Sequence, residues 1–155
     1  MFKPIKGGVT APKGFKAAGV KAGIKKSGKE DVAVIFSTVP ASAAALFTTN
    51  AMAAAAVQVS REVAAKGTAR AMVVNSGCAN SCTGETGLAD ARAMGRIAAT
   101  ELGLAADEVF VASTGIIGVN LPMDKVADGI KRAVAELSEQ GYDKTLQAII
   151  TTDTS

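Results

Sequence analysis

The sequence predicts an α/β fold, built from layers of helices and strands, for a single domain over residues 1–155. Residues 69–74 and 109–112 are apolar runs typical of buried strands, and each is followed by a polar turn and an amphipathic helix. Hydrophobic residues make up 48% of the chain but aromatic residues only 4%, so the core must consist mostly of Ala, Val, Ile and Leu, with small residues permitting close packing. Successive strand and helix units imply parallel strands, which brings the turns 75–77 and 113–115 to one edge of the sheet.

In the first half of the chain, the sequence predicts short strands and short helices. Residues 7–29 are rich in Gly and Lys and favour short strands joined by turns, whereas residues 32–36 form a buried strand candidate that Pro40 would end. The alanine-rich stretch 41–56 is interpreted as a short helix and a turn, followed by a strand through residues 55–59. Ser60 is then placed as the cap of a short helix over 61–66, with Gly67 at its C′ position.

The second half predicts three helices. Apolar or small residues recur on one face over 88–102, and again at Val126, Ile130, Ala133, Val134 and Leu137. A last short helix follows Gly141 and leads into the hydroxyl-rich stretch 151–155.

Charge and hydropathy give little support to nucleic-acid or membrane partners. The net charge is only +3, and the chain contains neither a long run of like charges nor 18 consecutive apolar residues. The lysines at 21, 25, 26 and 29 form a loose basic patch that is interpreted as a solvated loop. Because the first residues lack the apolar segment of a secretory signal, we expect a cytoplasmic protein.

The absence of histidine from the sequence excludes several kinds of site within this chain. Without an imidazole, a Ser-His-Asp or Cys-His arrangement has no base, and a His/Cys zinc site is also excluded because only Cys78 and Cys82 remain. Any nucleophile therefore needs an amine, a carboxylate or a second chain to activate it.

Thr114 and Gly115 are the leading candidates for a functional site, because they follow the buried strand at 109–112. A glycine at the carboxyl end of a strand lets a ligand approach the backbone, and N–H groups in such a turn can face a developing negative charge. The alternative is that the turn simply ends a strand. Cys78 and Ser76 are alternative candidates for a nucleophile, but no base lies near them in the sequence. The glycines at 77, 84 and 87 could cradle a phosphate, but their spacing is unusual and favours a connecting loop.

Four separated motifs resemble the α-chain region of the ornithine acetyltransferase (glutamate N-acetyltransferase) family of arginine biosynthesis. They are residues 8–15 (GVTAPKGF), 75–84 (NSGCANSCTG) with 87–91 (GLADA), 113–118 (STGIIG) with Leu121-Pro122, and 151–154 (TTDT). They occur in the family's order and span nearly the whole chain.

The resemblance implies an enzyme that is made as one precursor and cuts itself before a threonine, which becomes the nucleophile at the start of a β chain. Its own amino group can act as the base. The acetyl group would pass from N-acetylornithine to this threonine and then to glutamate; some members also accept acetyl-CoA, and no other cofactor is expected. Thr114 and Gly115 would form the oxyanion hole, and Thr151 would bind the amino-acid substrate.

The resemblance also implies a helix–sheet–sheet–helix sandwich completed by the β chain, in an α2β2 heterotetramer. The family's Lys-Gly-rich segment and its Ala-Thr cleavage point do not occur before Ser155, so we expect this chain alone to be inactive. Two alternatives stay open at this point: a non-catalytic small-molecule-binding α/β module, and an amidase that depends on Cys78.

Overall fold

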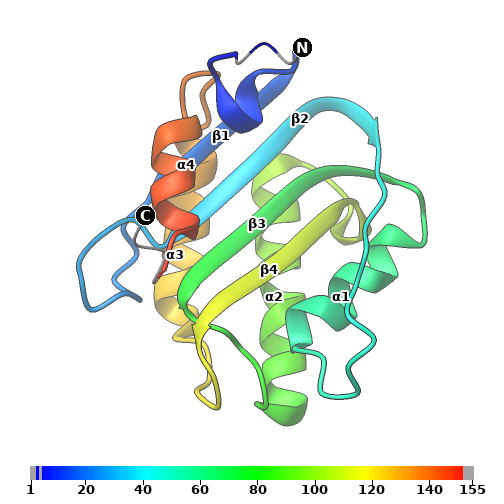
Figure 1. Cartoon of the computed structure of the whole chain (residues 1–155), viewed down its shortest axis with the longest axis vertical. Coiled ribbons are helices and arrows are strands. Elements are labelled where there is room, and N and C mark those ends of the chain that lie inside the picture. Colours follow the sequence, from blue (N-terminus) through cyan, green and yellow to red (C-terminus); the bar gives the residue numbers. More distant parts are fainter. Residues whose placement is uncertain (1–2, 4, 152–155) are drawn as a thin grey trace.

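The computed structural model of the chain describes residues 3 and 5–151 (Figure 1). Its strands are β1 (Phe15–Val20), β2 (Val32–Ser42), β3 (Thr68–Cys78) and β4 (Val109–Ile116). Its α-helices are α1 (Ala55–Ala64), α2 (Gly84–Leu102), α3 (Met123–Ala135) and α4 (Tyr142–Ile149). The later part of the hydroxyl-rich stretch, 152–155, lies outside the described residues.

The strands form one mixed sheet in the order β1-β2-β3-β4. β2 is antiparallel to both β1 and β3, whereas β3 and β4 are parallel and are connected through α2. Parallel strands need a crossover connection of this kind, because a tight turn reverses the chain direction and can join only antiparallel strands. The α/β class and the parallel pair predicted from the two strand and helix units are therefore confirmed.

The two faces of the sheet are covered differently. α2 and α3 lie behind the sheet in Figure 1, where Met94 and Ile130 pack against buried valines of β2, β3 and β4. α4 lies in front, over β1 and β2, and its Ala148 packs against Ala33 and Val74. The core consists mostly of alanine and valine, as the composition predicted, whereas isoleucine and leucine contribute less than predicted.

α4 covers only part of its face, because Met72 and Phe110 on the same face are half-buried. Within the described residues the chain forms a single sheet. The second sheet of the expected sandwich, and the β chain that would complete it, stay predictions.

Several predicted boundaries are wrong. β3 and β4 continue through the residues predicted as polar turns, and β2 continues past Pro40 to Ser42. Pro40 is tolerated there because the register with β3 breaks between Phe36 and Ala41, where its missing N–H costs no ladder bond. Between residues 7 and 29 the structure has one strand, β1, and a single 3-10 turn at Gly8–Thr10.

The region around α1 differs most from the prediction. Residues 43–54 are irregular rather than helical, and residues 55–59, predicted as a strand, belong to α1. The buried residues of α1 have the three- and four-residue spacing of one helical face; they are Ala55, Ala56, Val59, Ser60 and Val63. The helix ends at Ala64, close to the predicted stop, and Gly67 follows with a φ of +72°.

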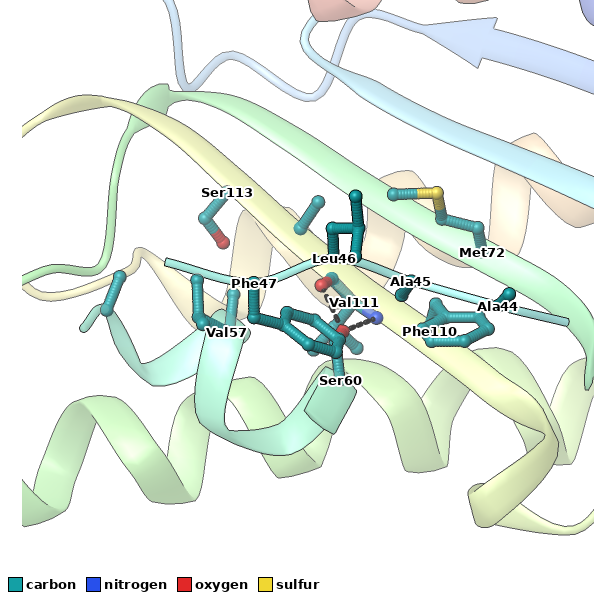
Figure 2. Close-up of a pocket in the computed structure, with 13 residues that line it drawn as sticks. Ala44, Ala45, Leu46, Phe47, Val57, Ser60, Met72, Phe110, Val111 and Ser113 are labelled. Atoms are coloured by element: carbon teal, nitrogen blue, oxygen red, sulfur yellow. Dashed lines mark hydrogen bonds between the residues drawn. The ribbon is translucent and has the colours of Figure 1, made fainter. Parts of the chain in front are cut away.

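Ser60 is therefore not a helix cap but a buried residue of α1 that contacts the outer edge of β4 (Figure 2). Its hydroxyl donates to the carbonyl of Val111 at 2.6 Å and accepts the Val111 N–H at 3.0 Å. At the opposite edge of the sheet, the N–H and C=O of Ala17 in β1 bond with the backbone of Ser138, at 2.9 and 3.1 Å. Each edge strand is thus contacted on its outer side by one serine.

Candidate functional site

The two polar stretches predicted to share an edge lie side by side as paired ends of β3 and β4. Asn75 is opposite Ser113, Ser76 opposite Thr114, and Gly77 opposite Gly115. They are paired strand residues rather than turns. The prediction that they line one end of the sheet is nevertheless confirmed.

Gly77 and Gly115 let the two strand ends approach closely. Their φ angles are +100° and +131°, in the region that side chains disfavour. A Cβ added at Gly115 would lie 2.4 Å from the Gly77 carbonyl carbon and 2.7 Å from the Cys78 nitrogen. Glycine is required at position 115 both by its conformation and by this backbone contact.

Strand alternation fixes the directions of the two candidate oxyanion donors. Val111 directs its N–H and C=O away from β3, toward Ser60, and Ile116 directs its C=O back toward β3 at Ala79. Alternate residues repeat these directions, so the N–H of Gly115 faces the outer edge of β4. Thr114 is half-buried and shares the sheet face of Ala112, which is the face that α4 covers.

Thr114, Gly115 and Thr151 line one cavity of about 610 Å³. The other lining residues are Gly77 and Ile116 from the strand ends and residues 24–27 from the loop between β1 and β2. Thr151 is exposed and follows α4 by two residues. All three site residues predicted from the sequence are therefore brought to the same cavity, from two separate parts of the chain.

The loop between β1 and β2 is held by the carboxylate of Asp31, which is fully buried. It accepts the backbone N–H groups of Ala22 and Ile24, each at 2.6 Å, and that of Lys25 at 2.9 Å. A buried carboxylate is tolerated when several donors satisfy its oxygens in this way. The loop consequently has a defined shape where it forms the cavity wall.

Lys25 is a site residue that the sequence did not single out. Its ammonium group donates to the carbonyls of Glu30 at 2.8 Å, Gln147 at 3.1 Å and Ile150 at 2.6 Å, and Ala148 O lies at 3.5 Å. Burial lowers the pKa of Lys25, and the nearby carboxylates of Asp31 and Glu30 oppose this effect. The basic patch was interpreted as a solvated loop, and for Lys25 that interpretation is wrong.

The alternative nucleophiles are poorly placed. Ser76 is buried, and its hydroxyl donates to the Ala148 carbonyl. Cys78 is buried, and its sulfur lies 3.1 Å from the Val119 carbonyl oxygen. Cys82 is exposed, and the sequence contains no histidine that could act as its base. Across the described residues, no cluster of three or more His, Cys, Asp or Glu side chains could hold a metal ion, and no helix is long and apolar enough to cross a membrane.

A second hollow lies on the outer side of β4, between α1 and the segment 44–47 (Figure 2). Its walls are mainly apolar, with Phe47, Met72 and Phe110 among them, and the hydroxyl of Ser60 is already engaged by Val111. The buried hydroxyl of Ser113 also lines this groove without a hydrogen-bond partner among the described residues, but none of the lining side chains is an acid or base that could activate it. The chemistry is better placed at the end of β4, near Thr114.

The chain is similar over nearly all its length to proteins of arginine biosynthesis. A model described as the ArgJ family matches residues 16–155. The arginine biosynthesis bifunctional protein ArgJ of Symbiobacterium thermophilum is 51% identical over 152 residues, which cover 97% of this chain and 38% of that protein. Its counterpart from Streptomyces coelicolor is 52% identical over 147 residues, which cover 94% of this chain and 38% of that protein. The chain thus spans about 38% of the length of these relatives.

Two crystal structures also match. Ornithine acetyltransferase from Mycobacterium tuberculosis, complexed with ornithine, superposes with a TM-score of 0.92 and 45% identity, covering 97% of this chain and 83% of that one. The arginine biosynthesis bifunctional protein from Bacillus halodurans superposes with a TM-score of 0.89 and 41% identity, covering 96% of this chain and 78% of that one.

Proposed function

This chain belongs to the ArgJ family, and from that premise we propose that it forms part of the active site of an acetyltransferase. The reaction proposed is transfer of an acetyl group from N-acetylornithine to glutamate in arginine biosynthesis. The observation that carries the proposal is the convergence of Thr114, Gly115 and Thr151 on one cavity. Thr114 and Gly115 are assigned to the oxyanion hole, and Thr151 to binding of the amino-acid substrate.

The nucleophile in this proposal is a threonine at the start of a second polypeptide cut from the same precursor. Its hydroxyl oxygen attacks the acetyl carbon of N-acetylornithine, and its own α-amino group takes the hydroxyl proton. The carbonyl oxygen becomes an oxyanion, which the Thr114 hydroxyl and the Gly115 N–H stabilise by donating hydrogen bonds. The C–N bond then breaks, and ornithine leaves with the proton.

The second half of the reaction repeats this chemistry. The α-amino nitrogen of glutamate attacks the acetyl ester, the same two donors stabilise the second oxyanion, and the threonine oxygen leaves and regains its proton. A nucleophile that carries its own base is consistent with a sequence that has no histidine. The partner is the β chain, in an α2β2 assembly, and we propose acetyl-CoA as an alternative acetyl donor.

The test is Thr114→Val in the full-length protein, with ornithine release measured as a function of N-acetylornithine and glutamate concentration. Valine keeps the β-branched shape but removes the donor, so kcat should fall by about 10²–10³-fold. Thr100→Val is the matched control, because Thr100 is exposed on α2 and bonds only within its own helix. Turnover within about twofold of the parent would show that the oxyanion assignment is wrong.

Turnover, intact-mass and binding measurements on the full-length parent protein separate the proposal from a non-catalytic binding module. An enzyme should release ornithine and carry an acetyl group, which intact-mass measurement detects as an added 42 Da on the chain that begins with threonine. A full-length protein that binds N-acetylornithine without turnover or acetylation would instead be a binding module.

A further inference from the structure

We propose that Lys25 is a positioning residue, which ties the end of α4 to the loop between β1 and β2 and thereby holds Thr151 beside Thr114 and Gly115. The inference rests on the proposed function, because it concerns how the substrate-binding residue Thr151 reaches its place. It assigns no contact between Lys25 and the substrate.

The first step of the argument is that the backbone of Lys25 is fixed. Its N–H bonds to the buried carboxylate of Asp31, and the main chain of Asp31 bonds to both neighbouring strands: its N–H to Val20 O at 2.9 Å and its C=O to Ser76 N at 2.8 Å. Asp31 therefore anchors the loop to the sheet at the level of Ser76, which is paired with Thr114.

The second step is that this loop touches the glycine pair of the site. A Cβ added at Gly77 would lie 3.1 Å from Ile24 Cγ2 and 3.2 Å from the Lys25 nitrogen. The main chain of Lys25 is thus packed against the end of β3, at the residue that is paired with Gly115 of β4.

The third step is that the side chain of Lys25 reaches the end of α4. The last carbonyls of a helix have no partner within the helix and carry the negative end of its dipole, so a cation stabilises them. Lys25 Nζ bonds to the carbonyls of Gln147 and Ile150, and Ile150 immediately precedes Thr151. Figure 1 shows the loop and the end of α4 side by side.

A hydrogen bond from Ser76 also reaches the end of α4, but it does not replace the contact made by Lys25. The Ser76 hydroxyl bonds to Ala148, one turn before the cavity, whereas Lys25 bonds to the residue next to Thr151. Since its ammonium is occupied by protein carbonyls and half-buried, Lys25 acts through Thr151. Lys26, next in the sequence, is exposed at the cavity and makes no comparable contact within the described part of the chain.

The test is a double-mutant cycle in the full-length protein with Lys25→Met, Thr151→Val and the combination, measuring kcat and the KM values for N-acetylornithine and glutamate. Each single change should raise KM by about fivefold, the usual effect of one lost hydrogen bond. The KM of the double variant should exceed that of the weaker-binding single variant by no more than about twofold, because both changes act on the same proposed contact, between Thr151 and the substrate. kcat should stay within about threefold, since the oxyanion donors are on β4 and keep their geometry.

Lys21→Met is the matched control, since Lys21 is exposed in the same loop and does not line the cavity. Thermal unfolding and intact mass confirm that each variant is folded and processed. If Lys25→Met gives no processed protein, Lys25→Gln takes its place in the cycle; it removes the charge but keeps a donor, and should raise KM by about two- to threefold with the same lack of additivity.

The outcomes separate the two proposals. If Thr151→Val leaves both KM values unchanged, the substrate-binding assignment fails and the inference fails with it. If Thr151→Val raises KM but the Lys25 variant does not, only the inference is wrong. If both raise KM and the double variant shows their product, Lys25 acts independently of Thr151, which also overturns the inference.

Discussion

Replacement of Gly115 by alanine should damage stability and turnover together. At a φ of +131° a residue with a Cβ costs about 1–3 kcal/mol. The new Cβ would also lie 2.4 Å from the Gly77 carbonyl carbon, a backbone atom that cannot rotate away, and overpacking of this kind costs about 1–3 kcal/mol more. The sum, about 2–6 kcal/mol, is a large part of the stability of an ordinary domain.

Gly103→Ala is the matched control for this experiment. Gly103 follows α2 with a φ of +66°, and a Cβ there would meet no atom within 4 Å. It therefore carries only the conformational cost, about 1–2 kcal/mol. We would compare urea unfolding midpoints and turnover of the two full-length variants. If Gly115→Ala lowers the midpoint no more than Gly103→Ala does, the close backbone contact is not what requires glycine at this position.

Two further predictions concern stability. Ser60→Ala leaves the Val111 N–H and C=O without a partner at a buried position, so it should cost about 1–3 kcal/mol; an unchanged urea midpoint would contradict the role given to this hydroxyl. Burial raises the pKa of Asp90. The unfolded chain therefore releases this proton at a lower pH than the folded chain, and stability falls as pH rises from about 4 through the raised pKa. Asp90→Asn should remove that fall and be more stable than the parent at neutral pH but not at pH 3; a difference that is the same at all pH values would refute this explanation.

The parts of the fold that were predicted correctly depend on burial patterns along single elements. Continuous apolar runs identified β3 and β4, and the helical stripes identified α2, α3 and α4. Residues 55–59 were predicted as a strand because Val57 and Val59 alternate with other residues. In the structure Val59 belongs instead to the buried face of a helix, together with Ser60 and Val63. Tertiary contact with β4, which no local pattern encodes, decided between these two periodicities.

The site was predictable only in part for the same reason. Thr114 and Gly115 could be found as polar residues at a buried strand end, and Thr151 from the family resemblance. Lys25 could not, because in the sequence it is one of two adjacent lysines. What distinguishes it from Lys26 is the contact with Gln147 of α4, 122 residues later in the chain. The buried Asp31, which fixes its backbone, was the available signal, since a carboxylate beside an apolar strand must find donors nearby.

The serines that contact the outer strands also determine how this sheet can grow. An added strand needs an uninterrupted row of free N–H and C=O groups, and Ser138 occupies that row on β1 while Ser60 occupies it on β4. Past Val111, the row of free N–H and C=O groups on β4 leads to Gly115, which lines the cavity. An extended segment from another molecule could therefore join β4 only past Val111, along the residues that lead to Gly115. Under the proposed function, association through this edge and turnover would exclude each other.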